Sequence, residues 1–139
     1  MKTTVTDHAR SATMRAVKSK NTTPEMIVRQ LVYGLRYRFR LYRKDLPGKP
    51  DLVFAGRRKI IMVNGCFWHG HGCARGARRP KTNSDYWKAK IDRNVARDAV
   101  NIAALRNAGW NVLTVWECET KSADRPALEQ KLRGFLSET

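Results

Sequence analysis

Four potential metal ligands lie within the eight residues from Cys66 to Cys73, together with two large aromatic side chains. Cysteine and histidine at this close spacing are typical of a bound transition metal, because zinc prefers thiolate sulfur and imidazole nitrogen. The adjacent Phe67 and Trp68, in a segment with several glycines, indicate a surface that stacks on a flat partner. In a chain as basic as this one, we expect that partner to be a nucleobase.

A structural zinc site needs four ligands. Cys66 and Cys73, with His69 or His71 between them, offer three from one loop, and Cys118 is a distant candidate for the fourth. Cys66, His71, Cys73 and Cys118 would form a closed set of three thiolates and one imidazole. The alternative is that the thiols are small buried apolar side chains. Because three cysteines cannot all pair within one chain, we expect reduced thiols in a cytosolic protein.

If His69 is not a zinc ligand, it is available for a catalytic role, since neutral imidazole is a competent general base near pH 7. Asp51 follows Pro50 after a tight turn and begins a strand. An aspartate there can hold Mg²⁺ against a phosphate, because magnesium prefers hard oxygen ligands. Taken alone, Asp51 is explained equally well as a carboxylate that caps the turn.

The charge balance indicates the partner. The 139 residues include 28 Lys and Arg against 12 Asp and Glu, a formal net charge of +16. This excess favours a polyanion such as DNA, bound with a steep dependence on salt, over small metabolites. The alternative is a basic surface that only confers solubility. No run approaches the roughly 18 apolar residues of a membrane span, and the first 20 residues lack an apolar signal region. We therefore expect a cytoplasmic protein.

The elements that must position these residues follow an α/β pattern, with a basic N-terminal arm over 1–20 and a single domain over 21–139. Strands are predicted over 36–43, 51–54, 59–63 and 112–116 from alternating or short apolar runs. The first helix is capped by Thr23, has Pro24 in its first position, and buries Val28, Leu31, Val32 and Leu35. A long helix extends from Ser84 to near Gly109, and a last one from about Arg125 to Leu136.

Two acids lie on helix faces that should point inward. Glu25 projects along the buried stripe of the first helix, either as an exposed first-turn acid or as an inward-pointing group. Asp98 lies on the apolar stripe of the long helix. A buried carboxylate needs partners, so Asp98 is either a structural brace or part of a site. The stripe comprises Trp87, Ile91, Val95, Asp98, Ile102 and Leu105.

Several short motifs occur in a characteristic order over nearly the whole chain. They are Pro50-Asp51, the strand 59–63, Gly-Cys-Phe-Trp-His at 65–69, Asn-Val-Ala-Arg-Asp at 94–98, Gly109-Trp110 and Val-Trp-Glu-Cys at 115–118, with Arg10-Ser11, Met14-Arg15-Ala16 and Glu25. This order resembles the very short patch repair (Vsr) endonucleases. That family nicks DNA beside the thymine–guanine mismatch left by deamination of 5-methylcytosine.

The resemblance implies a restriction-endonuclease-like fold, a mixed central sheet flanked by helices, with a structural zinc site. That fold usually follows its proline–aspartate with an acid-x-lysine strand, but no Asp or Glu occurs here between Asp51 and Asp85. By resemblance, Mg²⁺ is held by Asp51 and the backbone carbonyl of Val63, His69 activates or positions water, and Glu25 orients His69. Asp98 matches a further acidic position, and the zinc set matches the four ligands named above.

The chain departs from the best-known family pattern at Val63-Asn64, where that pattern has threonine and histidine. Asn64 can hydrogen-bond but cannot shuttle a proton at neutral pH. Any acid–base duty of that histidine is therefore lost, or moves to His69 or to water. Asp98, if it normally braces the missing histidine, would bond Asn64 instead.

The resemblance also implies how DNA is held. Phe67 and Trp68 would wedge into the base stack, where a mismatch is least costly to unstack. Trp87 is a third wedge residue or, alternatively, a core side chain. Met14 and Arg15 would grip the minor-groove side. Basic residues at 57–59, 75–81 and 88–97 would hold phosphates.

We thus expect a bacterial, nucleoid-associated enzyme that nicks the thymine strand of double-stranded DNA as a monomer and hands it to downstream repair proteins. Two alternatives remain: a zinc-stabilised DNA-binding module without catalysis, and a restriction-type enzyme that cuts both strands.

Overall fold

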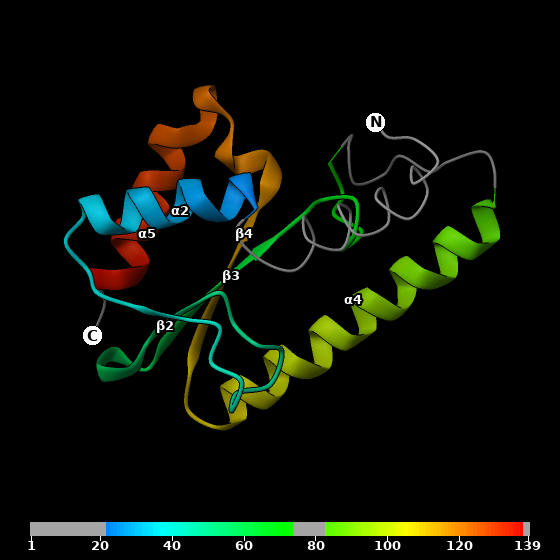
Figure 1. Cartoon of the computed structure of the whole chain (residues 1–139), viewed down its shortest axis with the longest axis horizontal. Helices are drawn as coiled ribbons and strands as arrows, with labels where there is room; N and C mark the ends of the chain where they lie inside the picture. Colours follow the sequence, from blue (N-terminus) through cyan, green and yellow to red (C-terminus); the bar gives the residue numbers. More distant parts are fainter. Residues whose placement is uncertain (1–21, 74–82, 138–139) are drawn as a thin grey trace, which may run out of the picture.

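The structure is a computed structural model, and it describes residues 22–73 and 83–137 (Figure 1). The helices are α2 (Thr23–Gly34), α4 (Ser84–Asn107) and α5 (Arg125–Ser137). The strands are β1 (Arg40–Leu41), β2 (Leu52–Phe54), β3 (Lys59–Asn64) and β4 (Asn111–Trp116). Short 3-10 helices follow β2 and β4: η1 (Ala55–Arg57), η2 (Glu117–Thr120) and η3 (Ser122–Asp124). The predicted arm, with Met14 and Arg15, and the basic run 75–81 lie outside the described residues.

The four strands form one mixed sheet in the order β1-β2-β3-β4, which confirms the predicted α/β class. β1 with β2 and β2 with β3 are antiparallel, whereas β3 and β4 are parallel and joined through α4. The parallel pair is in register from Lys59 opposite Asn111 to Asn64 opposite Trp116. Both strands therefore end at the same edge of the sheet, where β2 begins.

Helices cover both faces of this sheet (Figure 1). α2 and α5 pack against the face that carries Leu52, Phe54, Ile61 and Val115. The opposite face carries Val53, Ile60 and Met62 and is covered by Leu105 of α4 with Trp110. The two sets alternate along β2 and β3, as side chains of a strand buried on both faces must.

The predicted strand over 36–43 is too long, since only Arg40 and Leu41 pair. The reason is local: Arg36 and Tyr42 have left-handed backbone, with φ of 70° and 52°, and an extended strand cannot continue through such residues. Tyr37 and Phe39 nevertheless pack on the core from this segment, as the alternation predicted.

Two helix details also differ from expectation. Thr22 rather than Thr23 caps α2, with its side chain accepting from the Glu25 amide. Asn83 is the N-cap residue of α4, so Ser84 is already helical. Within the described residues, no helix combines the length and the apolar character needed to cross a membrane.

Candidate active site and metal centre

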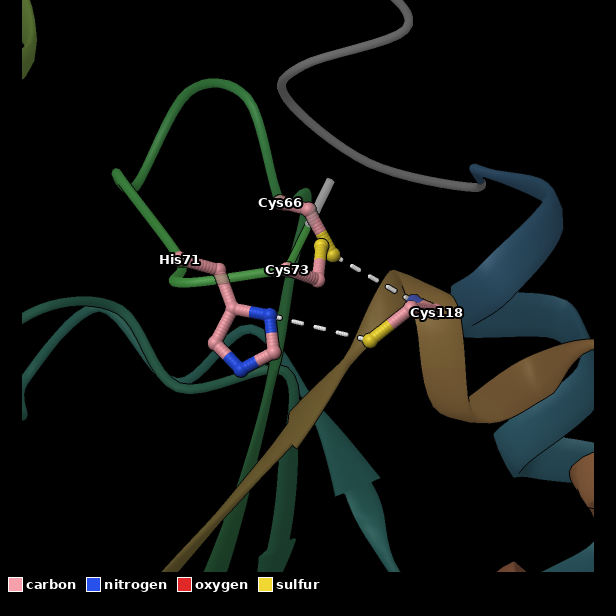
Figure 2. Close-up of side chains that lie close together, drawn as sticks. All are labelled: Cys66, His71, Cys73 and Cys118. Carbon is pink, nitrogen blue, oxygen red and sulfur yellow. Dashed lines mark hydrogen bonds between the residues drawn. The ribbon is translucent and has the colours of Figure 1, made fainter. Parts of the chain in front are cut away.

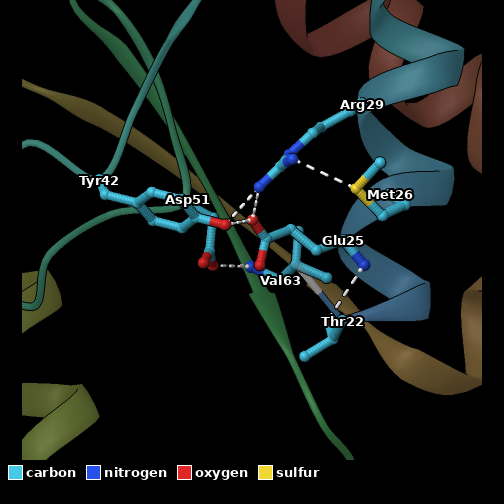
Figure 3. Close-up of polar contacts among 7 residues, drawn as sticks. All are labelled: Thr22, Glu25, Met26, Arg29, Tyr42, Asp51 and Val63. Carbon is cyan, nitrogen blue, oxygen red and sulfur yellow. Dashed lines mark hydrogen bonds and ion pairs between the residues drawn. The ribbon is translucent and has the colours of Figure 1, made fainter. Parts of the chain in front are cut away.

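Asp51 lies where β2 begins, next to the end of the parallel strand β3. Its Oδ2 accepts a hydrogen bond of 2.7 Å from the backbone amide of Val63 (Figure 3). The N–H and C=O of one strand residue point to the same neighbouring strand, so the Val63 carbonyl also faces the Asp51 side. Burial, only partly offset by the hydrogen bond from the Val63 amide, raises the pKa of Asp51 from 3.8 to about 7. The site thus disfavours the carboxylate unless a cation joins it.

His69 is held by α4. Its Nδ1 lies 2.5 Å from Oδ2 of Asp98, and its backbone amide donates to the Gly65 carbonyl at 3.2 Å. With Nδ1 engaged, Nε2 is the ring nitrogen left for other chemistry. One turn before Asp98, the side-chain amide of Asn94 donates to the Trp68 carbonyl at 2.9 Å. The loop is therefore tied to α4 at two points. The expectation that Asp98 would bond Asn64 is wrong, because His69 takes that carboxylate.

Glu25 points inward and is 2% exposed, which decides between the two readings of this acid. Its carboxylate hydrogen-bonds Arg29 and Tyr42 (Figure 3). The carboxylate that contacts His69 in this structure is thus that of Asp98, not that of Glu25. Arg29 was not foreseen, although its spacing four residues after Glu25 is the usual signal of a helical ion pair. Nothing in the sequence pattern points to Tyr42.

One cavity of about 550 Å³ is lined by Glu25, Asp51, His69 and Asp98. It brings together most of the predicted catalytic residues, while Asn64 lines a neighbouring cavity that also reaches Asp51 and His69. Three cations of α4 line the larger cavity on one helix face. Its lining includes Glu25, Asp51, Val63, Phe67, Trp68, His69, Lys90, Arg93, Asn94, Arg97, Asp98 and Glu117.

The predicted cysteine–histidine set also comes together (Figure 2). One ligand atom from each of Cys66, His71, Cys73 and Cys118 lies within 4.8 Å of the others. The first three come from the loop after β3 and Cys118 from η2 after β4, so the parallel pairing of the two strands makes the cluster. Three thiols and one imidazole fit a tetrahedral zinc site.

Contacts within the cluster fix its geometry. The Cys118 amide donates to Sγ of Cys66 at 3.3 Å, and Sγ of Cys118 lies 3.6 Å from Nδ1 of His71. The His71 ring stacks on Trp116, with centroids 4.2 Å apart. Burial raises the pKa of the Cys66 thiol to about 12 and also raises the pKa of Cys118. A bound cation would offset that cost, because it favours thiolates.

Phe67, Trp68 and Trp87 form an aromatic cluster beside the cavity. Their ring centroids are 5.1 to 5.6 Å apart. Trp87 is half-buried and packs against Phe67 and Trp68, apart from the two core clusters of the described residues, and its role as a wedge stays a prediction. Tyr86 extends the row, with its ring 5.3 Å from that of Trp87 and 56% of the residue exposed. Because Tyr86 directly precedes Trp87 in the sequence, its place in this row of aromatic rings could have been predicted.

Comparisons with known proteins point to one family. A family model described as DNA mismatch endonuclease Vsr matches residues 3–75. The type II nicking enzyme V.XorIIP of Xanthomonas oryzae pv. oryzae is 54% identical over 123 residues, 88% of each chain.

The chain belongs to the Vsr family of DNA mismatch endonucleases.

Two further relatives extend the comparison. The DNA mismatch endonuclease Vsr of Escherichia coli is 37% identical over 130 residues, 91% of this chain and 83% of that protein. The type II nicking enzyme V.NmeAIP of Neisseria meningitidis is 40% identical over 117 residues, 84% of this chain and 83% of that protein. Membership in the Vsr family makes this protein a DNA endonuclease, in agreement with its net charge of +16.

Proposed function

We propose that this protein nicks the strand that carries the mispaired thymine at T:G mismatches in DNA, the lesion left by deamination of 5-methylcytosine. The observation that supports this most is the shared cavity: Asp51 and the His69–Asp98 pair lie in it beside Phe67 and Trp68. Hydrolytic groups and base-stacking groups thus lie in one hollow. The proposed fold is of the restriction-endonuclease type, and we propose that the protein acts as a monomer.

Asp51 and the Val63 carbonyl would hold Mg²⁺, since both are hard oxygen donors on one side of β3 and the buried carboxylate needs a cation. When bound, magnesium neutralises charge on the phosphate and makes a coordinated water more acidic. Zinc would be held by Cys66, His71, Cys73 and Cys118. Its role is to fix the loop that carries the aromatics.

His69 is the proposed general base. Its Nε2 accepts a proton from the attacking water as the water oxygen bonds to phosphorus and the bond from phosphorus to the leaving sugar oxygen breaks. Asp98 holds the ring in the required tautomer and stabilises the imidazolium that forms. The leaving alkoxide takes a proton from solvent. Asn64 takes no part in proton transfer, which the His69–Asp98 pair carries instead.

The aromatic cluster would supply discrimination. Inserting rings between base pairs requires unstacking, which costs a few kcal/mol and least at a mismatch. The relatives in the comparison are bacterial proteins, so the proposed substrate is bacterial chromosomal DNA. The nick is the substrate for downstream repair enzymes that remove and resynthesise a short tract.

The test is to incubate the protein with Mg²⁺ and duplexes that contain either a T:G or a matched C:G pair, and to map the products on each strand. We expect one nick on the thymine strand of the T:G duplex and none with Asp51→Ala. Tight mismatch binding without product would instead indicate a binding module. Double-strand breaks in matched DNA would indicate a restriction-type enzyme.

A further inference from the structure

A second cavity of about 320 Å³ lies beyond Asp51. It is lined by the turn before β2, by the end of β3 and by α4. Asp51, Val63, His69 and Asp98 line both cavities. The two cavities therefore adjoin at these four residues. A phosphate bound at Asp51 would be accessible from both sides.

The two sides differ in their cations. The first cavity is lined by Lys90, Arg93 and Arg97. Among the described residues that line the second, Lys49 is the one lysine or arginine, and it shares that cavity with Asp51 and Asp98. A phosphodiester develops negative charge on its oxygens as it reacts, and cations at those oxygens lower the barrier. On the second side the two acids would oppose that charge, and Lys49 is the side chain placed to compensate.

The turn that carries Lys49 is fixed in place. The Lys49 amide donates to the Leu46 carbonyl at 3.3 Å, with Pro47 and Gly48 between them and Gly48 at φ +77°, the pattern of a type II turn. A Cβ on Gly48 would lie 3.2 Å from Cβ of Asn101, so the turn packs closely on α4. This contact fixes Lys49 directly before Pro50 and Asp51.

Lys49 itself has left-handed backbone, with φ +46°. Glycine or asparagine would adopt this conformation at less cost than lysine. Strained residues of this kind concentrate at functional sites. Within residues 22–73 and 83–137, Lys49 forms no ion pair, whereas Arg43 in the same connection pairs with Asp45 at 2.6 Å. Lys49 is thus an exposed residue at the rim of this cavity.

We propose that Lys49 is a further catalytic residue, which contacts a non-bridging oxygen of the scissile phosphate from the side opposite the α4 cations. This inference rests on the proposed nicking activity and deepens it. Lys49 donates a hydrogen bond and keeps its proton. The bonds that form and break are those of the hydrolysis described above.

The experiment compares Lys49→Asn, Lys49→Arg and Lys44→Gln with wild type. Lys44→Gln is the matched control, because Lys44 is an exposed lysine of the same connection that lines neither cavity. Single-turnover nicking of a T:G duplex is measured with saturating protein and Mg²⁺. Binding is measured separately with Ca²⁺ in place of Mg²⁺, and thermal unfolding is recorded for each variant.

For Lys49→Asn we expect the nicking rate to fall about 100-fold, the loss typical of one charge-stabilising donor. The dissociation constant should change less than about fivefold, as for one lost phosphate contact. Lys49→Arg should recover most of the rate, because it keeps the charge. Lys49→Asn should unfold at no lower temperature than wild type, since asparagine tolerates the backbone. Lys44→Gln should match wild type throughout.

Three outcomes would overturn the inference. The first is that Lys49→Asn nicks at the wild-type rate, and the second is that it loses affinity for DNA but no nicking rate. The third is that Lys49→Asn and Lys49→Arg both lose activity and both unfold at a lower temperature than wild type. A wild-type protein that leaves T:G duplexes uncut contradicts the proposed function itself. Wild-type nicking that survives Lys49→Asn contradicts the role of Lys49 alone.

Discussion

The two ends of the β3–β4 pair both carry clusters of polar residues, and the clusters serve different purposes. At the carboxyl ends, Asp51, His69 and Asp98 face a cavity, and burial raises the pKa of Asp51. At the opposite end, the consecutive basic residues 57–59 all donate to backbone carbonyls at the ends of helices. Arg57 bonds Leu136 O at 3.3 Å, Arg58 bonds Ala108 O at 2.6 Å, and Lys59 bonds Phe135 O.

The difference shows which cations are committed to the fold. The last carbonyls of a helix have no partners within the helix and carry its negative dipole end, so basic side chains stabilise them. Arg57 and Lys59 serve α5 in this way, and Arg58 serves α4 while also lying over the Trp110 ring at 4.5 Å. These contacts give residues 57–59 a structural role at the helix ends, and the expectation that they hold DNA phosphates stays a prediction. The α4 cations that line the cavity are better placed for that purpose.

The Asp51→Asn variant is the sharpest test of the end of the β3–β4 pair that carries the candidate active site. We expect nicking of a T:G duplex to fall by at least about 10³-fold, because the variant loses the charge that draws a cation to the phosphate. The shape of the side chain and the hydrogen bond from the Val63 amide are retained. The measurement is the single-turnover rate at saturating protein. Nicking within tenfold of wild type would remove Asp51 from the chemistry.

The same variant should be more stable than wild type without metal at pH 8. In the folded state the pKa of Asp51 is raised from 3.8 to about 7, so the folded state binds the proton more tightly than the unfolded state. This stabilisation is complete below about pH 4 and is lost as pH rises to about 7, a decline of at most roughly 4 kcal/mol. The amide of the Asp51→Asn variant does not titrate, so its stability lacks this decline. Urea unfolding at pH 5 and pH 8 checks the sign, and Mg²⁺ should stabilise only wild type at pH 8.

Cys118→Ser tests the metal centre, which joins the ends of β3 and β4. Removing one of four ligands from a structural site costs several kcal/mol where the metal contributes to folding. We expect loss of stoichiometric zinc by elemental analysis and a lower unfolding temperature. The nicking rate should fall together with the zinc content and the unfolding temperature, because the loop after β3 that holds the zinc ligands also carries Phe67 and His69. Equal zinc content in the variant and wild type would show that Cys118 is not a ligand.

Much of this architecture could be predicted from the sequence. The apolar runs predicted β2, β3 and β4, and the cysteines and histidines of the loop after β3, together with Cys118, predicted a cluster that could hold a metal. Partner choice among polar groups could not be predicted, because it depends on which side chain each element brings within bonding distance. Two examples are the contact of Asp98 with His69 and the contacts of Glu25 with Arg29 and Tyr42. The contacts of residues 57–59 with carbonyls at the helix ends could not be predicted for the same reason.

The salt dependence of DNA affinity distinguishes the α4 cations at the cavity from the basic residues 57–59 at the opposite end of the β3–β4 pair. Arg93→Gln should lower the slope of log affinity against log salt by about 0.9, the value of one phosphate contact, on both T:G and matched duplexes. Arg57→Gln should leave that slope unchanged, because its guanidinium is bound to the end of α5. Fluorescence titrations over a range of salt concentrations provide both slopes. A slope unchanged by Arg93→Gln would contradict the assignment of the α4 cations to DNA.

Lys59→Met should have the smallest effect. Lys59 is 3% exposed, and its ammonium group donates to the Phe135 carbonyl and lies over the Phe135 ring. Replacing the buried charge by an apolar side chain of similar length removes the hydrogen bond to the Phe135 carbonyl and also the cost of burying the charge, so the two effects oppose each other. We expect unfolding free energy within about 1 kcal/mol of wild type, with unchanged nicking rate and salt slope. A reduced salt slope for Lys59→Met would place this end of the sheet on DNA after all, and the contrast between the two ends would fail.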